Sequence, residues 1–138
     1  MEIKIYSKLP TEAMKIRTAV FIEEQKFKEE FDGFDDLSRH LVAFDGNTPV
    51  ATCRIYPNGE GAFIIGRLAV VKEYRGKDIG SLVLKAAELE IIKEGGKLAL
   101  LHSQCAAERF YEKNGYSTCS EIDLDEDCPH IWMSKKLS

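Results

Sequence analysis

A basic loop with two glycines, Arg75–Gly80, contains residue types that can hold a phosphate group. It follows the apolar run Phe63–Val71, which is typical of a strand buried on both faces, and it opens into the helical stretch Ser81–Ile92. The first turn of a helix presents unpaired backbone N–H groups and the positive end of the helix dipole. We therefore expect a phosphate or pyrophosphate to bind in this loop.

Other residues of the chain have side chains suited to proton transfer. A tyrosine phenol has a reference pKa of about 10, and histidine titrates near neutrality. Tyr111 follows Phe110, and two adjacent aromatic rings are by themselves typical of a packed core. A lone histidine such as His40, His102 or His130 is more often structural than catalytic. Both interpretations stay open for these residues until geometry is known.

The elements that must position these residues follow from hydrophobic periodicity and turn signals. The stretch 97–102 is a second short buried strand, and the intervening helix makes it a parallel neighbour of the strand at 64–71. Asp45-Gly46 is a strong signal for a hairpin between strands at 40–44 and 50–56. The remaining predicted elements are a strand at 2–6, a helix from 11 to about 25, a short helix at 106–113 and an antiparallel pair at 116–124 and 130–136. The fold class is a mixed α/β (α+β) domain over residues 1–138, with a mostly antiparallel sheet and one parallel pair.

Two linked motifs resemble those of the GNAT superfamily, the N-acetyltransferases that use acetyl-coenzyme A. The loop Arg75–Gly80 is similar to the family's R-x-x-G-x-G/A pyrophosphate loop, and Ala107–Tyr116 is similar to its A-x-x-F-Y-x-K-x-G-F/Y segment. The loop departs from the pattern at Asp78, which replaces the first glycine. Aspartate tolerates left-handed backbone angles, so we expect the turn to survive, with the carboxylate facing solvent or paired with Lys77.

Three further segments resemble the small ElaA-like group of this superfamily. They are the pattern Arg17-x-x-Val20-Phe21-x-x-Glu24-Gln25, Asp36 with the run His40–Val42, and the closing H-x-x-M strand from His130 to Met133. The resemblance implies a GNAT fold in which the two parallel strands splay apart around pantetheine. It also implies cofactor contacts at the following residues: Leu68, Ala69, Val70, Arg75, Gly76, Lys77, Asp78, Ile79, Gly80, Ser81, Gln104, Ala107, Phe110 and Tyr111.

The resemblance implies transfer of an acetyl group from acetyl-CoA to a primary amine of a small molecule or peptide, by direct attack in a ternary complex (an EC 2.3.1.- activity). Tyr111 is then the candidate general acid. The central strand contains no glutamate, so the candidate bases are four residues, or a water chain that ends on one of them: Glu24, His40, His102 and His130.

An acidic segment with phenylalanines set into it, Glu23–Asp36, reads either as a solvated loop or as a lid that attracts a cationic amine. Acceptor substrates bind in this region of GNAT enzymes. The predicted acceptor-binding residues are Arg17, Phe21, Glu24, Gln25 and His40.

Composition excludes several classes of function. The net charge of −4 and scattered basic residues argue against a nucleic-acid partner. The chain shows neither a signal peptide nor an apolar run of membrane-spanning length, so we expect a cytoplasmic protein without a membrane partner. Its four cysteines form no C-x-x-C pair, so we expect reduced thiols and no metal site.

Two alternatives to an enzyme remain. Asp78 and the missing strand glutamate are compatible with an acyl-CoA-binding regulatory module of little or no turnover. The other alternative is an interaction domain that binds no cofactor. A monomer and a homodimer are both compatible with the family resemblance.

Overall fold

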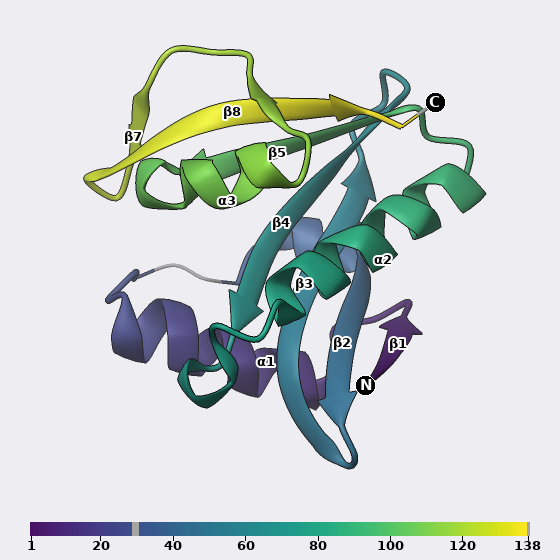
Figure 1. Ribbon diagram of the computed structural model, residues 1–138, viewed down its shortest axis with the longest axis vertical. Coiled ribbons are helices and arrows are strands. Elements are labelled where there is room, and N and C mark those ends of the chain that lie inside the picture. Colours follow the sequence, from purple (N-terminus) through teal and green to yellow (C-terminus); the bar gives the residue numbers. More distant parts are fainter. Residues whose placement is uncertain (29–30, 138) are drawn as a thin grey trace.

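The computed structural model describes residues 1–28 and 31–137, whose strands form one open sheet (Figure 1). Among these residues, eight strands run in the order β1-β2-β3-β4-β5-β8-β6, with β7 paired to β8. Only β4 and β5 are parallel neighbours in the described part of the chain, which confirms the predicted sheet. The strands are β1 (Glu2–Tyr6), β2 (Arg39–Asp45), β3 (Thr48–Pro57), β4 (Ala62–Val70), β5 (Leu98–Gln104), β6 (Ser117–Thr118), β7 (Asp123–Asp125) and β8 (Cys128–Lys136).

Helices lie on both faces of this sheet. The longer ones are α1 (Thr11–Arg17), its π-helical continuation η1 (Thr18–Glu24) and α2 (Ile79–Lys93). The short ones are the 3-10 helices η2 (Gly33–Leu37), η3 (Lys72–Tyr74) and η4 (Cys105–Ala107), and α3 (Glu108–Lys113). None of the helices in the described ranges combines the length and the apolar composition needed to cross a bilayer.

The first helix departs from the prediction at Thr18, where α-helical geometry gives way to a π-helix. The Gln25 N–H donates to the Val20 carbonyl, five residues back, at 3.0 Å. Wide turns of this kind are frequent at functional sites. Here the π-helical segment contributes Phe21, and the turn after it contributes Gln25, to the cavity described below.

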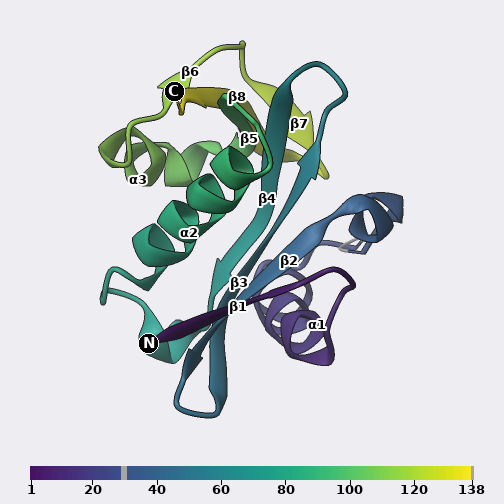
Figure 2. The ribbon, with the colours of Figure 1, turned by 90° about the vertical axis from the view of Figure 1, so that its right-hand side faces the viewer.

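Burial on both faces of the central strands follows from their composition. In β2, Leu41 and Ala43 join the core under α2, whereas Val42 and Phe44 join the core under α1. Alternate residues of a strand face opposite sides, so this continuous apolar run holds a helix on each face. Figure 2 shows α1 and α2 on opposite sides of β2, β3 and β4.

The hairpin turn at Asp45-Gly46 agrees with its prediction from the sequence, whereas the strand predicted at 116–124 does not form as one strand. The hairpin of β2 and β3 pairs Asp45 with Thr48, and Gly46 takes a φ of +61° between them. The predicted strand at 116–124 is instead divided into β6 and β7, which both pair with β8. Between them, the Trp132 N–H donates to the Ser120 hydroxyl at 3.0 Å, so a side chain replaces the backbone acceptor of a continuous ladder.

Candidate functional site

The site is formed where the parallel strands β4 and β5 separate. Their pairing covers only Ala62–Ile64 and Leu98–Leu100. Beyond it, β4 remains paired with β3 as far as Val70, and β5 remains paired with β8 as far as Gln104. The facing edges of β4 and β5 therefore lose their mutual hydrogen bonds, which leaves backbone N–H and C=O groups open to another partner.

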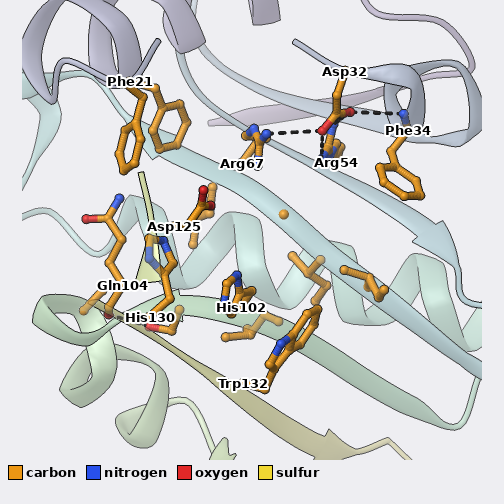
Figure 3. A pocket seen from close by; sticks show the side chains of 18 of the residues that line it. Phe21, Asp32, Phe34, Arg54, Arg67, His102, Gln104, Asp125, His130 and Trp132 are labelled. Atoms are coloured by element: carbon orange, nitrogen blue, oxygen red, sulfur yellow. Dashed lines mark hydrogen bonds and ion pairs between the residues drawn. The ribbon is translucent and has the colours of Figure 1, made fainter. Parts of the chain in front are cut away.

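A cavity of about 790 Å³ occupies this gap. Its walls come from Ile64–Leu68 of β4, from Leu101–Gln104 of β5 and from His130 and Trp132 of β8, with further aromatic residues from η1, η2, β3 and α3. Figure 3 shows side chains from these elements converging on one space. The volume is that of a typical small-molecule site.

A β-bulge shapes the β4 wall of this cavity. Thr52 pairs with Ala69 and Arg54 pairs with Gly66, so Cys53 alone lies opposite both Arg67 and Leu68. Arg67 takes a φ of +55°, a left-handed conformation that costs a side-chain-bearing residue about 1 kcal/mol or more. Bulges next to active sites redirect side chains and release backbone groups from the ladder. Both bulge residues line the cavity.

Buried ion pairs attach the loop after η1 to the sheet. Asp35 accepts from Arg17 Nη1 at 2.8 Å and from Arg54 Nη1 at 2.9 Å, and all three side chains are buried. Burial opposes ionisation of Asp35, but the hydrogen bonds and charges of the two guanidinium groups outweigh it and lower its pKa to about 2. Asp32 binds Arg54 at 2.6 Å and Arg67 at 3.3 Å (Figure 3).

Asp32 and Asp35 lie in the acidic segment singled out from the sequence, but neither they nor Arg54 and Arg67 were selected as individual site residues. A signal for one of them was present. Arg54 lies in the middle of an otherwise apolar strand, and a buried guanidinium needs a carboxylate partner. Its Nε is the only buried side-chain nitrogen or oxygen without a hydrogen bond among the described residues.

Two histidines lie on the wall formed by β5 and β8. His102 Nε2 lies 2.7 Å from Asp123 Oδ1, and the His102 ring stacks on Trp132 with centroids 4.8 Å apart. His130 Nδ1 lies 2.8 Å from the Cys128 carbonyl oxygen. The centroids of the two imidazole rings are 4.7 Å apart. This pair can accept protons at the cavity surface.

The loop before α2 has the geometry expected of a phosphate site. Asp78 precedes the helix with φ 60° and ψ 19°, which confirms that aspartate accommodates the left-handed turn, and its side chain is exposed. No side chain caps the first turn of α2, so its backbone N–H groups face the loop without intrahelical acceptors. Gly76 also takes a positive φ, +78°, with open space beside it.

Comparison with known proteins connects this geometry to a family. Residues 36–118 match the model of the acetyltransferase (GNAT) domain. The chain belongs to the GNAT acetyltransferase family. It is 34% identical over 127 residues to the uncharacterized N-acetyltransferase YjcF of Bacillus subtilis, a match that covers 90% of each protein.

Solved structures of GNAT proteins share the fold. The crystal structure of ElaA from Escherichia coli superposes with a TM-score of 0.84 at 26% identity, over 97% of this chain and 98% of ElaA. An aminoglycoside 6'-N-acetyltransferase crystallised with coenzyme A gives a TM-score of 0.80 at 19% identity, over 100% and 98% of the two chains, which shows the fold alone. The predicted resemblance to the GNAT superfamily and to ElaA is therefore confirmed.

The structure separates the predicted GNAT base candidates into two groups. His102 and His130 line the cavity, whereas Glu24 and His40 do not. Glu24 forms a bidentate ion pair with Arg75, with N–O distances of 2.6 and 2.7 Å. Hydrogen bonding to the Arg75 guanidinium lowers the pKa of the Glu24 carboxyl group. His40 is buried beside the Asp35 carbonyl oxygen, 3.0 Å from Nε2, and burial lowers its pKa.

Tyr111 lies at the cavity wall on α3. Its ring packs edge-on against Phe110 and Tyr116, with centroids 5.0 and 6.0 Å away. Burial raises the pKa of the phenol, so the hydroxyl stays protonated. The residue as a whole is half-buried, and it is one of the residues that line the cavity.

The other predicted GNAT contacts are distributed over the cavity and the loop. Of the acceptor-binding residues, Phe21 and Gln25 line the cavity, while Arg17 lies in the buried ion pairs; Glu29 and Glu30 of the acidic segment lie outside the described residues. Gln104 donates from Nε2 to Gln25 Oε1 at 2.8 Å. Four of the predicted cofactor-binding residues line the cavity: Leu68, Gln104, Ala107 and Tyr111. Two others, Ala69 and Val70, continue β4, and Phe110 packs against Gly80. The rest form the loop and the first turn of α2: Arg75, Gly76, Lys77, Asp78, Ile79, Gly80 and Ser81.

Proposed function

We propose that the protein is an N-acetyltransferase that transfers the acetyl group of acetyl-CoA to a primary amine of a small molecule or peptide, by direct attack in a ternary complex. The observation that supports this most strongly is the separation of β4 and β5 after three residue pairs, with a cavity in the gap. Backbone N–H and C=O groups away from bulk water are almost always paired, so the separated edges favour a ligand that binds between the two strands. Acetyl-CoA would supply the activated thioester.

The residues present fit such a donor. The unpaired edge of β4, with the bulge at Arg67 and Leu68, offers backbone groups to a pantetheine amide and an acetyl oxygen. The uncapped first turn of α2 and the side chains of Arg75 and Lys77 suit a diphosphate. Arg75 is held by Glu24 in this state, and an exposed pair of this kind contributes little stability, so a diphosphate can compete for it.

We assign Tyr111 as the general acid that protonates the departing thiolate. Its hydroxyl is protonated, and the residue lines the cavity on α3, in the segment that follows β5. The phenol proton moves to sulfur as the carbon–sulfur bond breaks.

We assign the proton-accepting role to the histidine pair, His102 and His130, because both line the cavity. The Asp123 carboxylate can only accept a hydrogen bond, so it keeps the proton on Nε2 of a neutral His102 and leaves the Nδ1 lone pair available. The Cys128 carbonyl likewise keeps the proton on Nδ1 of neutral His130. A bound ammonium group can lose a proton to either ring, directly or through water, and the neutral amine that results attacks the acetyl carbon.

The decisive experiment measures release of the CoA thiol from acetyl-CoA with a panel of primary amines, alongside CoA binding by calorimetry. Amine-dependent release supports the enzyme. Binding without release supports the regulatory module, and absence of binding supports an interaction domain.

Charge reversal tests the loop. Arg75→Glu should raise the Kd for CoA at least tenfold, because a cation that faces the diphosphate becomes an anion. The matched control Lys93→Glu changes an exposed cation at the opposite end of the same helix and should leave the Kd unchanged. Equal affinities for the two variants would contradict the assignment of the loop.

A further inference from the structure

Three side chains that can act as metal ligands lie close together on the β5–β8 wall of the cavity. His102, Asp125 and His130 each offer one ligand atom, and these atoms lie within 4.8 Å of one another. Figure 3 shows the three side chains facing the same space. The elements that hold them, β5, β7 and β8, are hydrogen-bonded neighbours, so the cluster rests on rigid strands.

Strand register explains why these residues meet. Gln104 is opposite His130, and His102 is opposite Trp132, so the two histidines are diagonal neighbours on one face of the β5–β8 pair. In the β7–β8 pair, Asp125 is opposite Cys128, so Asp125 is a diagonal neighbour of His130 on the edge of β8 that faces away from β5. Twenty-seven intervening residues separate the histidines in sequence, which is why no local motif predicts the cluster.

Both histidines have the second hydrogen bond that orients metal ligands. Histidines that bind a metal almost always donate their other ring N–H to a carboxylate or a backbone carbonyl. His102 has Asp123 in this role at 2.7 Å, and His130 has the Cys128 carbonyl at 2.8 Å. Each ring therefore keeps one nitrogen with a lone pair for a metal.

We propose that His102, Asp125 and His130 form a binding site for a divalent first-row transition metal, represented by Zn²⁺, with a remaining coordination position open to the cavity. Two histidines and one carboxylate are a ligand set that suits Zn²⁺ and its neighbours. Tetrahedral Zn²⁺ with bonds of about 2.1 Å spaces its ligand atoms by about 3.4 Å. The present spacing closes to that value with a modest movement, and Asp125 is exposed at the end of β7 and free to make it.

The site has a consequence that rests on the proposed function. A bound metal uses the lone pairs of the rings that would otherwise accept the proton of the amine. Zn²⁺ should therefore inhibit acetyl transfer without displacing CoA. The metal-free protein would be the active form, and failure of that form to turn over would count against the enzyme while leaving metal binding unaffected.

Calorimetric titration of the chelator-treated protein with ZnCl₂ tests the site directly. The titration uses a background in which the three cysteines outside the core, Cys105, Cys119 and Cys128, are replaced by serine, because thiolates also bind Zn²⁺. We expect one Zn²⁺ per chain and a visible absorption band when Co²⁺ replaces it.

His130→Gln and Asp125→Asn should each weaken Zn²⁺ binding at least tenfold, and Asp123→Asn should weaken it by about 10- to 100-fold through the orientation of His102. The matched control Asp127→Asn removes an exposed carboxylate from the same turn, at a left-handed position that asparagine tolerates, and should bind as the parent does. Thermal unfolding monitored by circular dichroism verifies that each variant is folded. Absence of binding, or equal affinity in the parent and the His130→Gln and Asp125→Asn variants, would overturn the proposal.

Discussion

Asp35 connects several of the elements around the cavity through buried hydrogen bonds. It has two buried arginine partners, Arg17 and Arg54, and also accepts from the Asp32 N–H at 3.1 Å within the capping box of η2. The same guanidinium of Arg54 reaches Asp32, and Asp32 reaches Arg67 of the bulge. Asp35 thus connects the first helix and the loop after it to β3, and Asp32 extends the network to β4, the strand that faces the acyl donor in our proposal.

Replacement of Asp35 should unfold the protein readily. Asp35→Asn leaves two buried guanidinium groups short of a negative charge, and loss of one partner of a buried ion pair costs about 3–5 kcal/mol. Urea denaturation measures this change in the free energy of unfolding. The control Asp36→Asn alters the exposed neighbour and should shift stability by no more than about 0.5 kcal/mol. Similar stabilities for the two variants would show that the ion pairs do not support the fold.

The proposed role of Tyr111 as general acid can be tested by a substitution that removes only its hydroxyl oxygen. Tyr111→Phe keeps the packing against Phe110 and Tyr116 but cannot protonate a thiolate, so kcat should fall about 100-fold or more. The Kd for CoA should stay nearly constant. Steady-state kinetics and calorimetry measure the two quantities. Tyr6→Phe, on the edge strand β1 outside the cavity, is the control, and a Tyr111 variant as active as this control would remove Tyr111 from the mechanism.

At the scale of elements, the start of α2 has a backbone conformation that favours binding of a diphosphate and a side-chain charge that opposes it. Asp78 gives the left-handed turn that aims the first N–H groups of the helix into the loop, yet its carboxylate lies beside the proposed diphosphate site. Asparagine tolerates the same backbone angles without the charge, and glycine adopts them without strain. Backbone and charge are therefore separable by substitution.

Asp78→Asn and Asp78→Gly should both lower the Kd for CoA several-fold, because each removes an anion and keeps the turn. Asp78→Ala removes the anion but requires alanine at φ 60°, which costs about 1–2 kcal/mol relative to glycine. Calorimetry with CoA and thermal unfolding separate the two effects. The explanation fails if the asparagine variant binds CoA no more tightly than the parent protein.

At the scale of the whole molecule, two hydrophobic cores lie on either side of the central strands, and four buried ionisable residues, Arg17, Asp35, His40 and Arg54, form a cluster beside α1. His40 and Asp35 are neighbours there, linked by the hydrogen bond of the ring to the Asp35 carbonyl oxygen. Burial lowers the pKa of His40, and the arginine partners lower that of Asp35 to about 2. In both cases the unfolded chain binds a proton more readily than the folded one.

Stability should therefore fall in two steps as the pH decreases. The first step begins below about pH 6.5, where an unfolded histidine gains a proton that His40 resists. The second lies between pH 3.8 and about 2, where Asp35 contributes about 2 kcal/mol that is lost on protonation. Urea denaturation across this range measures both. His40→Gln should remove the first step, and a stability independent of pH between 7 and 5 in the parent protein would contradict the assignment.

Local sequence determined the parts of this protein whose causes are local. The apolar runs of β2 and β3 specify strands buried on both faces, Asp45-Gly46 specifies the hairpin, and the loop at Asp78 specifies a left-handed start to α2. The run of β4 is less buried than its composition predicts, because its edge faces the cavity. The strand–helix–strand order makes β4 and β5 parallel. Each follows from the steric and hydrogen-bonding preferences of a few consecutive residues.

Only the tertiary structure decided which distant side chains meet. The ion pair of Glu24 with Arg75, the placement of Asp35 between two arginines and the meeting of His102 with His130 depend on strand register and on how far β4 and β5 separate. These contacts join residues between 18 and 51 positions apart, over which no local periodicity extends. Their geometry is set by the packing of whole elements, because side chains on separate strands and helices have no fixed relation until the sheet is formed.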